Sequence, residues 1–377
     1  MSDTTGIEWC DSTFNPWIGC AKVSPGCDHC YAAEWDRRFA VSGHAMRWGP
    51  KAERTRTSDA NWRRPMLWEK REFSECMGCG WRGEFREALD VHNPVGFHPP
   101  VERSKVCPRC REPLLKEARR RVFCASLADV FDNEVPTLWR VELLTLIGAT
   151  EKLDWLLLTK RIGNVKRLLC EAAELAHERG LFATAHWITS WVDGDPPPHV
   201  WLGATVVNQA EADRDIPKLL STPAAVRFLS VEPMLGPIDL TGEWLTAKLG
   251  AYPFKNLPRE HRTALLDLLD WVICGGESGP KARPMHPGWP RSLRDQCSAA
   301  GVPFLFKQHG EWLPTAFCEH DDRMLPSRRT VYVSPDGSFM PLGSDIDFFG
   351  GAEETAWVGK RAAGSKLDGV ECKAWPA

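Results

Sequence analysis

The 377-residue sequence contains no apolar run of roughly 18 residues, the length at which a segment becomes a candidate membrane-spanning helix. Its first residues, Met1-Ser-Asp-Thr-Thr-Gly, also lack the basic-then-apolar pattern of a secretory signal peptide. We therefore expect a cytoplasmic protein with no membrane partner. In that setting its 14 cysteines are reduced thiols or metal ligands rather than disulfides.

Three further absences argue against particular classes of function. A formal net charge of −3 predicts no strong overall attraction to nucleic acid. No glycine-rich turn of the dinucleotide-binding type follows the first expected strand. His286 and His309 are candidate proton-transfer residues, but neither lies near a Ser or Cys in a nucleophile motif, so hydrolysis is not predicted.

Cys20, Cys27 and Cys30 are the most informative residues that are present. They lie in a Gly- and Pro-containing loop between a short apolar run and a helix-like segment. A structural zinc site has four protein ligands, and no fourth is nearby, because His29 points away if both neighbouring cysteines bind one metal. Three thiolates suit a [4Fe–4S] cluster that leaves one iron open for a substrate or cofactor. The alternative is a zinc knuckle that a distant Cys or His completes.

A second group of cysteines forms two CxxC pairs. Gly78 and Pro108, which lie within the pairs, suit the tight turns that place two sulfurs on one metal. The spacing predicts a zinc ribbon with the ligands Cys76, Cys79, Cys107 and Cys110. The ribbon either contacts nucleic acid or a partner, or is only a structural staple.

The rest of the chain alternates between apolar runs and helical patterns. The expected strands are 7–19, 122–126, 153–160, 200–206, 226–233, 271–276 and 302–307, and the expected helices are 31–40, 141–147, 165–172, 209–220, 265–269 and 290–300. Near-continuous apolar strands that alternate with helices indicate a parallel sheet covered on its faces. The predicted fold is α/β, a partial (β/α) barrel of six to seven parallel strands, and the alternative is a doubly wound sheet.

Four regions follow from this pattern. Residues 1–69 hold the first barrel strand, the cysteine loop and a basic helical segment, and 70–115 form the zinc-ribbon insertion. Residues 116–314 complete the barrel, and 315–377 are a C-terminal extension.

Polar residues follow most of the expected strands. Reactive groups of such barrels gather at the C-terminal strand ends, so these residues predict a pocket on the same rim as the cysteine loop. The expected cofactor-binding residues are Ser126, Asp129, Thr205, Asn208, Glu232, Gly275, Gly276 and Glu277, and the expected catalytic residues are Glu232, Lys160 and Lys307.

Several of these residues have specific expected roles. Glu277 can bind an ammonium group, and Glu232 can accept a ribose hydroxyl or pair with Lys160. Lys160, Lys307, Arg161 and Arg283 can neutralise a carboxylate or phosphate. The structural alternatives are a tight turn at Gly275-Gly276 and ordinary ion pairs at the rim.

Several stretches resemble the phage gene product 37/68 family of radical-SAM-like proteins. The stretches are Asn15-Pro16-Trp17-Ile18-Gly19-Cys20, Cys27-Asp-His-Cys30-Tyr31-Ala32, Leu157-Leu-Thr159-Lys160-Arg161, Trp201-Leu-Gly-Ala-Thr205-Val206, Ser230-Val231-Glu232-Pro233, Gly275-Gly276-Glu277-Ser278-Gly279 and Phe306-Lys307-Gln308. The resemblance implies a [4Fe–4S] cluster on Cys20, Cys27 and Cys30 and S-adenosylmethionine (SAM) on its open iron. Reductive cleavage of SAM would then give a 5′-deoxyadenosyl radical that abstracts a substrate hydrogen.

The resemblance also implies an external electron donor of the flavodoxin or ferredoxin type. Phage association and the basic, Trp-rich segment 41–73 make a nucleotide or nucleic acid the first expected substrate. The spacing between the first two cysteines is longer than in radical SAM enzymes. These enzymes usually carry a motif similar to Gly-Gly-Glu on the second strand, whereas here it comes late in the strand order. Ser126 and Asp129, at the end of the second expected strand, are therefore expected to take over the role of this motif. The competing interpretations are a nucleic-acid-binding protein with structural metals and an iron–sulfur electron-transfer protein that does not use SAM.

Overall fold

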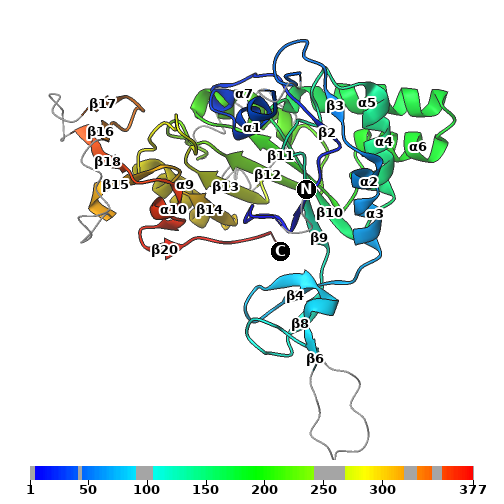
Figure 1. Ribbon diagram of the computed structural model, residues 1–377, viewed down its shortest axis with the longest axis horizontal. Coiled ribbons are helices and arrows are strands. Elements are labelled where there is room, and N and C mark those ends of the chain that lie inside the picture. Colours follow the sequence, from blue (N-terminus) through cyan, green and yellow to red (C-terminus); the bar gives the residue numbers. More distant parts are fainter. Residues whose placement is uncertain are drawn as a thin grey trace, which may run out of the picture.

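A seven-stranded parallel sheet forms the centre of the molecule (Figure 1). The computed structural model describes residues 5–40, 45–90, 105–241, 268–317, 329–341 and 350–376. The strands are β1 (Ser12–Thr13), β9 (Arg120–Cys124), β10 (Leu153–Thr159), β11 (Val200–Thr205), β12 (Val226–Val231), β13 (Trp271–Gly275) and β14 (Phe304–Gln308). Their spatial order is the order of the sequence, without the reversal that defines a doubly wound sheet. The half-barrel prediction is therefore confirmed, and the doubly wound alternative is wrong.

Helices cover the outer face of this sheet. They are α4 (Thr137–Gly148), α5 (Val165–Glu178), α6 (Phe182–Val192), α7 (Gln209–Leu220) and α9 (Gly288–Ala300). A continuous apolar layer between helices and sheet includes Trp155, Leu157, Val165 and Ile188. Five of the expected helices are confirmed, four in this layer and the fifth as α1 (Tyr31–Ala40). Helix α6 was not predicted, and most of the expected helix at 265–269 lies outside the described residues.

Aromatic side chains fill the inner face of the half-barrel. Trp201, Phe228 and Trp271 pack there with Trp9 and Phe123. Gly203 on β11 leaves the space that the Phe228 ring occupies, because a Cβ atom at this position would overlap the ring. Both faces of the strands are thus buried, which explains their near-continuous apolar sequence.

The two chain ends meet at the open side of the half-barrel. Near the C-terminus, Lys373 pairs antiparallel with Leu305 of the edge strand β14, and the ring of Trp375 lies 4.9 Å from that of Trp271. The Nζ atom of Lys373 lies 3.6 Å from a carboxylate oxygen of Glu8. The C-terminal segment therefore covers a sheet edge that would otherwise present unpaired backbone groups.

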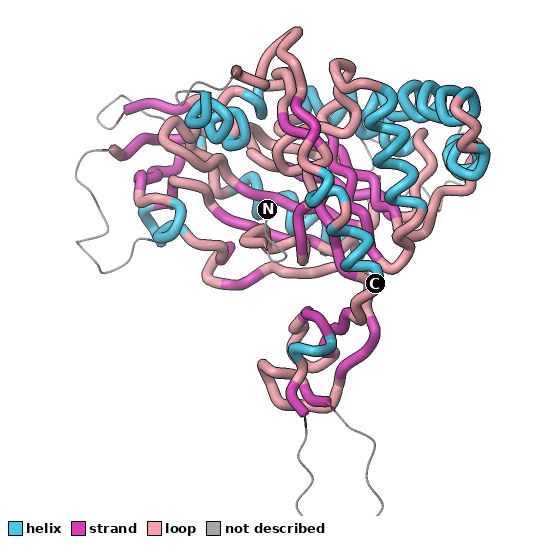
Figure 2. The backbone as a smooth tube through the Cα atoms, turned by 45° about the vertical axis from the view of Figure 1, so that its right-hand side comes forward, coloured by secondary structure: helices cyan, strands magenta, loops and turns pink. Residues whose placement is uncertain are grey.

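A small cysteine-bearing module projects from the sheet (Figures 1 and 2). It contains β4 (Phe73–Cys76), β5 (Arg82–Glu84), β6 (Leu89–Asp90), β7 (Lys105–Val106) and β8 (Leu115–Glu117), of which β5, β4 and β8 form one antiparallel sheet. Ion pairs from Arg82 to Asp11, at 3.1 Å, and from Arg120 to Glu84, at 2.6 Å, join it to the body. The module leads directly into β9 and so lies at the N-terminal ends of the barrel strands.

The remaining elements surround the half-barrel. The N-terminal part adds β2 (Trp17–Ile18), α1 (Tyr31–Ala40), β3 (Thr55–Arg56), α2 (Asp59–Trp62) and α3 (Arg64–Glu69). The C-terminal part adds the antiparallel sheet of β15 (Trp312–Pro314), β18 (Glu353–Trp357), β16 (Thr330–Val333) and β17 (Phe339–Pro341), then α10 (Lys360–Ala363), β19 (Lys366–Leu367) and β20 (Val370–Glu371). Within the described ranges, no helix combines the length and apolar character needed to cross a bilayer.

Candidate functional site

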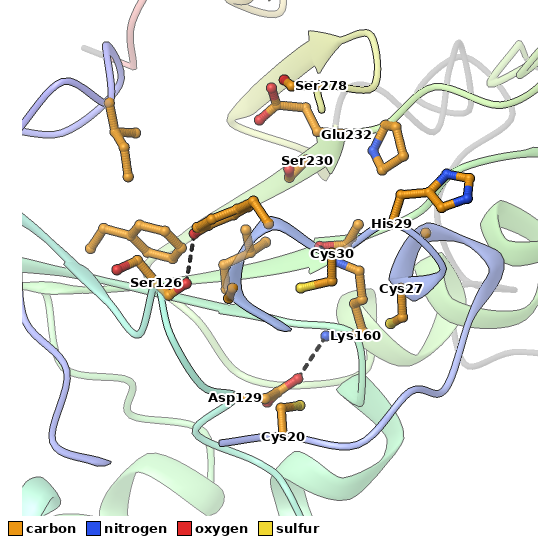
Figure 3. Close-up of a pocket in the computed structure, with 18 of the residues that line it drawn as sticks. Cys20, Cys27, His29, Cys30, Ser126, Asp129, Lys160, Ser230, Glu232 and Ser278 are labelled. Atoms are coloured by element: carbon orange, nitrogen blue, oxygen red, sulfur yellow. Dashed lines mark hydrogen bonds between the residues drawn. The ribbon is translucent and has the colours of Figure 1, made fainter. Parts of the chain in front are cut away.

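A cavity of about 430 Å³ lies at the C-terminal ends of the barrel strands (Figure 3). We call it the inner cavity. Cys20, Cys27 and Cys30 all line it. The strand ends contribute Ser126, Asp129, Lys160, Thr205, Ser230, Glu232, Gly276, Glu277 and Lys307. The expected convergence of the cysteine loop and the polar strand ends on one rim is thus present.

The three cysteines of the inner cavity are not arranged around a single ion. Their sulfur atoms do not form one of the compact ligand groups found among the described residues, in which all ligand atoms lie within 4.8 Å of one another. His29, the nearest alternative ligand, instead places its Nδ1 atom 3.0 Å from a carboxylate oxygen of Glu277, and its ring points away from Cys20 in Figure 3. Thiolates on a cluster bind separate irons and stand farther apart than ligands of one ion, so this donor set fits a cluster better than a zinc knuckle.

Two arginines that follow different strands of the sheet hold the cysteine loop. Arg161, which follows β10, donates from Nη1 to Cys20 Sγ at 3.3 Å and from Nη2 to the Ala21 carbonyl at 2.8 Å. Arg283, which follows β13, donates to the Pro25 carbonyl at 2.9 Å. The barrel therefore helps to position the loop, in addition to the loop's own turn at Pro25–Cys27.

Glu277 completes this support. Its two carboxylate oxygens accept hydrogen bonds from Arg283 at 2.6 and 2.8 Å, and one of them also contacts His29. Burial raises the pKa of Glu277, but the hydrogen bonds from Arg283 and His29 outweigh it and hold the pKa below its ordinary value. The carboxylate is charged and already bound by its own neighbours.

Glu232 and Lys307 form an ion pair in the cavity wall. Lys307 Nζ lies 3.1 Å from Glu232 Oε1. Among the described residues, no donor contacts the second carboxylate oxygen of Glu232. Lys160 pairs instead with a hydroxyl, since its Nζ atom lies 3.4 Å from Thr205 Oγ1. The wall thus offers a ligand one carboxylate oxygen and two ammonium groups.

The four cysteines of the projecting module form a compact group. The Sγ atoms of Cys76 and Cys110 lie 3.5 Å apart, those of Cys79 and Cys107 lie 3.6 Å apart, and all four lie within 4.8 Å. A zinc–sulfur distance of about 2.3 Å in a tetrahedral site implies sulfur–sulfur distances of about 3.8 Å. The spacing fits a metal ion, and none of the cysteines that the structure describes forms a disulfide.

Comparison with known proteins gives one result. A family model described as protein of unknown function, DUF5131, matches residues 4–376. The chain belongs to the DUF5131 family. No curated protein and no solved structure matches it. The match spans the half-barrel and both cysteine groups, so the residues that line the inner cavity lie within the part of the chain that matches the DUF5131 model.

Some residues expected to bind the cofactor of this DUF5131 protein do not face the inner cavity. Asn208 accepts a hydrogen bond from the Glu211 backbone at 3.0 Å and caps α7, and neither Asn208 nor Gly275 is among the lining residues. A Cβ atom on Gly275 would lie 2.7 Å from Glu232 Oε1, and one on Gly276 would overlap the His309 carbonyl. The two glycines therefore permit close packing against Glu232 and His309, which directly follow the neighbouring strands.

Other expected residues line the cavity but are engaged within the protein. Asp129 accepts hydrogen bonds from Thr159 Oγ1 at 2.8 Å and from the Lys160 backbone at 3.1 Å. Ser126 Oγ contacts Asn15 at 3.0 Å. Glu277, for which an ammonium-binding role is expected, has both carboxylate oxygens hydrogen-bonded to Arg283. These residues build the wall, whereas Glu232 keeps an oxygen for a ligand.

Several basic and aromatic side chains of the Trp-rich segment 41–73 pack within the protein, although other described residues of the segment are exposed. The buried Arg54 lies 2.8 Å from Asp132, and Arg56 lies 3.0 Å from Glu142. Trp68 is buried, and the Arg56 guanidinium lies over the Trp62 ring. These contacts give no support to a nucleic-acid surface on this segment of the DUF5131 protein.

Proposed function

We propose that the protein is a radical SAM enzyme in which Cys20, Cys27 and Cys30 hold a [4Fe–4S] cluster. The observation that carries this proposal is the convergence of three thiols from one loop on the same cavity as the polar strand ends of a parallel half-barrel. Three cysteine ligands leave one iron of such a cluster without a protein ligand. The resemblance to the phage gene product 37/68 family supports the same assignment.

The donor set and the space fit this group. No described side chain supplies a fourth ligand, because His29 is directed to Glu277. A volume of about 430 Å³ is within the range of small-molecule sites and leaves room for a cofactor beside the cysteines. When bound, the reduced cluster and SAM supply a 5′-deoxyadenosyl radical, and an external electron donor of the flavodoxin or ferredoxin type supplies the electron.

The protein's own residues position and protect this chemistry. Arg161 and Arg283 fix the loop, and the free oxygen of Glu232 can accept a hydrogen bond from a ribose hydroxyl or an ammonium group. Trp9, Phe123 and Leu158 provide apolar lining. An apolar wall excludes water, which protects a reactive intermediate from side reactions.

We further infer that the four-cysteine module binds zinc and acts as a structural staple. The compact spacing of its four sulfurs suits the tetrahedral coordination of one zinc ion. It lies at the N-terminal ends of the strands, whereas the inner cavity lies at their C-terminal ends. A direct role of this metal in the chemistry of the inner cavity is therefore not proposed.

Anaerobic reconstitution with iron and sulfide, followed by reduction in the presence of SAM, tests the enzyme assignment. We expect 5′-deoxyadenosine from the wild type and none from Cys27→Ala. The variant Cys170→Ala is the matched control, because this half-buried cysteine lies on α5, outside the inner cavity. An assembled cluster that leaves SAM intact would favour the electron-transfer interpretation, and zinc alone in both sites would favour purely structural metals.

A further inference from the structure

A second cavity, of about 390 Å³, adjoins the inner cavity. We call it the outer cavity. Helix α1 contributes Tyr31, Trp35 and Arg38 to its lining, and the loop after β13 contributes the segment 278–281. His29, Tyr31 and Ser278 line both cavities. A ligand in the outer cavity would therefore reach the inner cavity past Tyr31 and His29.

The charges of the outer cavity favour an anion. Its two acids are already paired, Glu34 with Arg37 at 2.6 Å and Asp28 with Arg283 at 3.4 Å. Arg38 and Lys281 are exposed, and no residue that the structure describes forms an ion pair with either. Two cations that lack a counter-charge among the described residues can each neutralise a phosphate oxygen.

Aromatic rings accompany these cations. The Tyr31 hydroxyl donates to the Ser126 carbonyl at 2.6 Å, which fixes the direction of its ring. The Tyr31 side chain is nevertheless 59% exposed, so its surface is available to a ligand. Trp35 is half-buried in the same lining. The Arg47 guanidinium lies 5.8 Å from the centre of the Trp35 ring, which leaves the fixed Tyr31 ring as the more accessible surface. Aromatic rings beside cations are the combination that binds a base and its phosphate.

We propose that the outer cavity binds a nucleoside phosphate, with the base against Tyr31 and Trp35 and the phosphate at Arg38 and Lys281. This inference rests on the proposed function. Because the outer cavity adjoins the inner cavity, the nucleoside phosphate is the substrate of the enzyme proposed for the inner cavity. A partly open hollow with aromatic lining suits a single base and phosphate better than the flat surface of a partner protein. The nucleotide is either free or part of a single strand.

Binding is measured without cluster chemistry, by fluorescence anisotropy of a labelled single-stranded oligonucleotide and by competition with an unlabelled nucleoside monophosphate. Arg38→Glu and Lys281→Glu are each expected to weaken binding about tenfold, since each replaces a phosphate contact by a repulsive charge. The control is Arg179→Glu, an equal charge change at an exposed position after α5. In the double variant Arg38→Ala/Lys281→Ala, the slope of log K against log salt becomes shallower by about 1.4, at about 0.7 per contact.

The competition also identifies the source of the ligand. If the monophosphate competes when its concentration equals the concentration of nucleotide units in the oligonucleotide, the ligand is a free nucleotide. If the strand binds and the monophosphate does not compete, the ligand is a nucleic acid. Ribose 5-phosphate is expected to compete at least about tenfold more weakly, because it lacks the stacking base.

Four results would overturn the proposal: no binding of either probe, unchanged binding in the Arg38→Glu and Lys281→Glu variants, equal competition by ribose 5-phosphate, or binding of an acidic electron-carrier protein in place of both nucleotides.

Because SAM cleavage is measured separately from nucleotide binding, the enzyme assignment and the substrate class can each fail without the other. Oligonucleotide binding that depends on Arg38 and Lys281 without SAM cleavage would refute only the enzyme assignment. SAM cleavage without nucleotide binding would refute only the substrate class.

Discussion

Arg161 Nη1 lies 3.3 Å from Cys20 Sγ, and the same guanidinium lies 3.5 Å from carboxylate oxygens of both Asp129 and Asp132. Burial lowers the pKa of Arg161, but the charges of Asp129, Cys20 and Asp132 outweigh it and hold the pKa above its ordinary value. A permanent cation thus lies against one of the three proposed cluster ligands.

This cation is expected to tune the cluster. Reduction adds negative charge, which Arg161 stabilises, and charge and hydrogen bonds at the sulfurs set the reduction potential of such clusters. Arg161→Gln should therefore shift the midpoint potential to a more negative value in a redox titration followed by electron paramagnetic resonance (EPR). Arg161→Lys, which keeps the charge, should show the smaller shift. Equal potentials in all three proteins would show that Arg161 is not electrostatically coupled to the cluster.

The two cysteine groups should load independently, because they lie at opposite ends of the barrel strands. Single replacement of Cys20, Cys27 or Cys30 by Ala should abolish the iron–sulfur absorbance and leave zinc bound. Replacement of Cys76 and Cys107 by Ser should release zinc and retain the cluster.

Metal analysis of each purified variant checks this independence. Full cluster absorbance in all three single variants would exclude the proposed ligand set. Unchanged zinc in the double variant would show that the projecting module is not the zinc site.

Glu232→Gln tests which carboxylate of the cavity binds the cofactor. The substitution keeps the side-chain shape but removes the charge beside Lys307. We expect SAM to bind about tenfold more weakly in anaerobic calorimetry, since a charge-assisted hydrogen bond contributes about 1.5 kcal/mol or more. Iron content should stay constant, and Glu174→Gln, an exposed position on α5, is the matched control. Equal affinity in both variants would remove Glu232 from the binding residues.

Asp154 should make stability depend on pH. Burial raises its pKa from 3.8 to about 6, although Arg119 and Arg121 oppose this shift. The folded protein therefore binds this proton more tightly than the unfolded chain, so stability is highest below about pH 4 and falls as the pH rises to about 6. Asp154→Asn removes the cost of burying the charge and should stabilise the protein at about pH 7.5 by at most about 3 kcal/mol.

Urea denaturation followed by Trp fluorescence measures this effect. The stabilisation by Asp154→Asn should shrink to less than about 1 kcal/mol at about pH 4, because the wild-type carboxyl is then neutral in the folded protein and only partly charged in the unfolded chain. Asp195→Asn, at an exposed position, should show no such pH dependence. An equal effect of Asp154→Asn at both pH values would point to packing rather than charge.

The sheet could be predicted from the sequence because its strands are buried on both faces. Leu156 packs on the inner face and Trp155 and Leu157 on the outer face, so β10 appears as an unbroken apolar run. Parallel strands in sequence order then bring the cysteine loop and Glu232 to one rim. The regular fold and the location of the cavity thus followed from local pattern alone.

The roles of individual side chains could not be predicted in this way. Arg161 and Arg283 contact the cysteine loop across 140 and 258 residues of sequence. Glu277 has the right charge for an ammonium ligand, but Arg283, six residues away, occupies it. The contacts of the two arginines with the cysteine loop depend on how loops from different strands meet, and the Glu277–Arg283 pair depends on how the loop after β13 folds back on itself.

The central claim is that a cluster on Cys20, Cys27 and Cys30 leaves one iron open to SAM. EPR spectra of the anaerobically reconstituted, reduced protein with and without SAM test it most directly. The account predicts a reduced-cluster signal that changes on SAM addition in the wild type and is absent from the Cys27→Ala variant. A cluster signal that SAM leaves unchanged, or a signal that persists in Cys27→Ala, would contradict it.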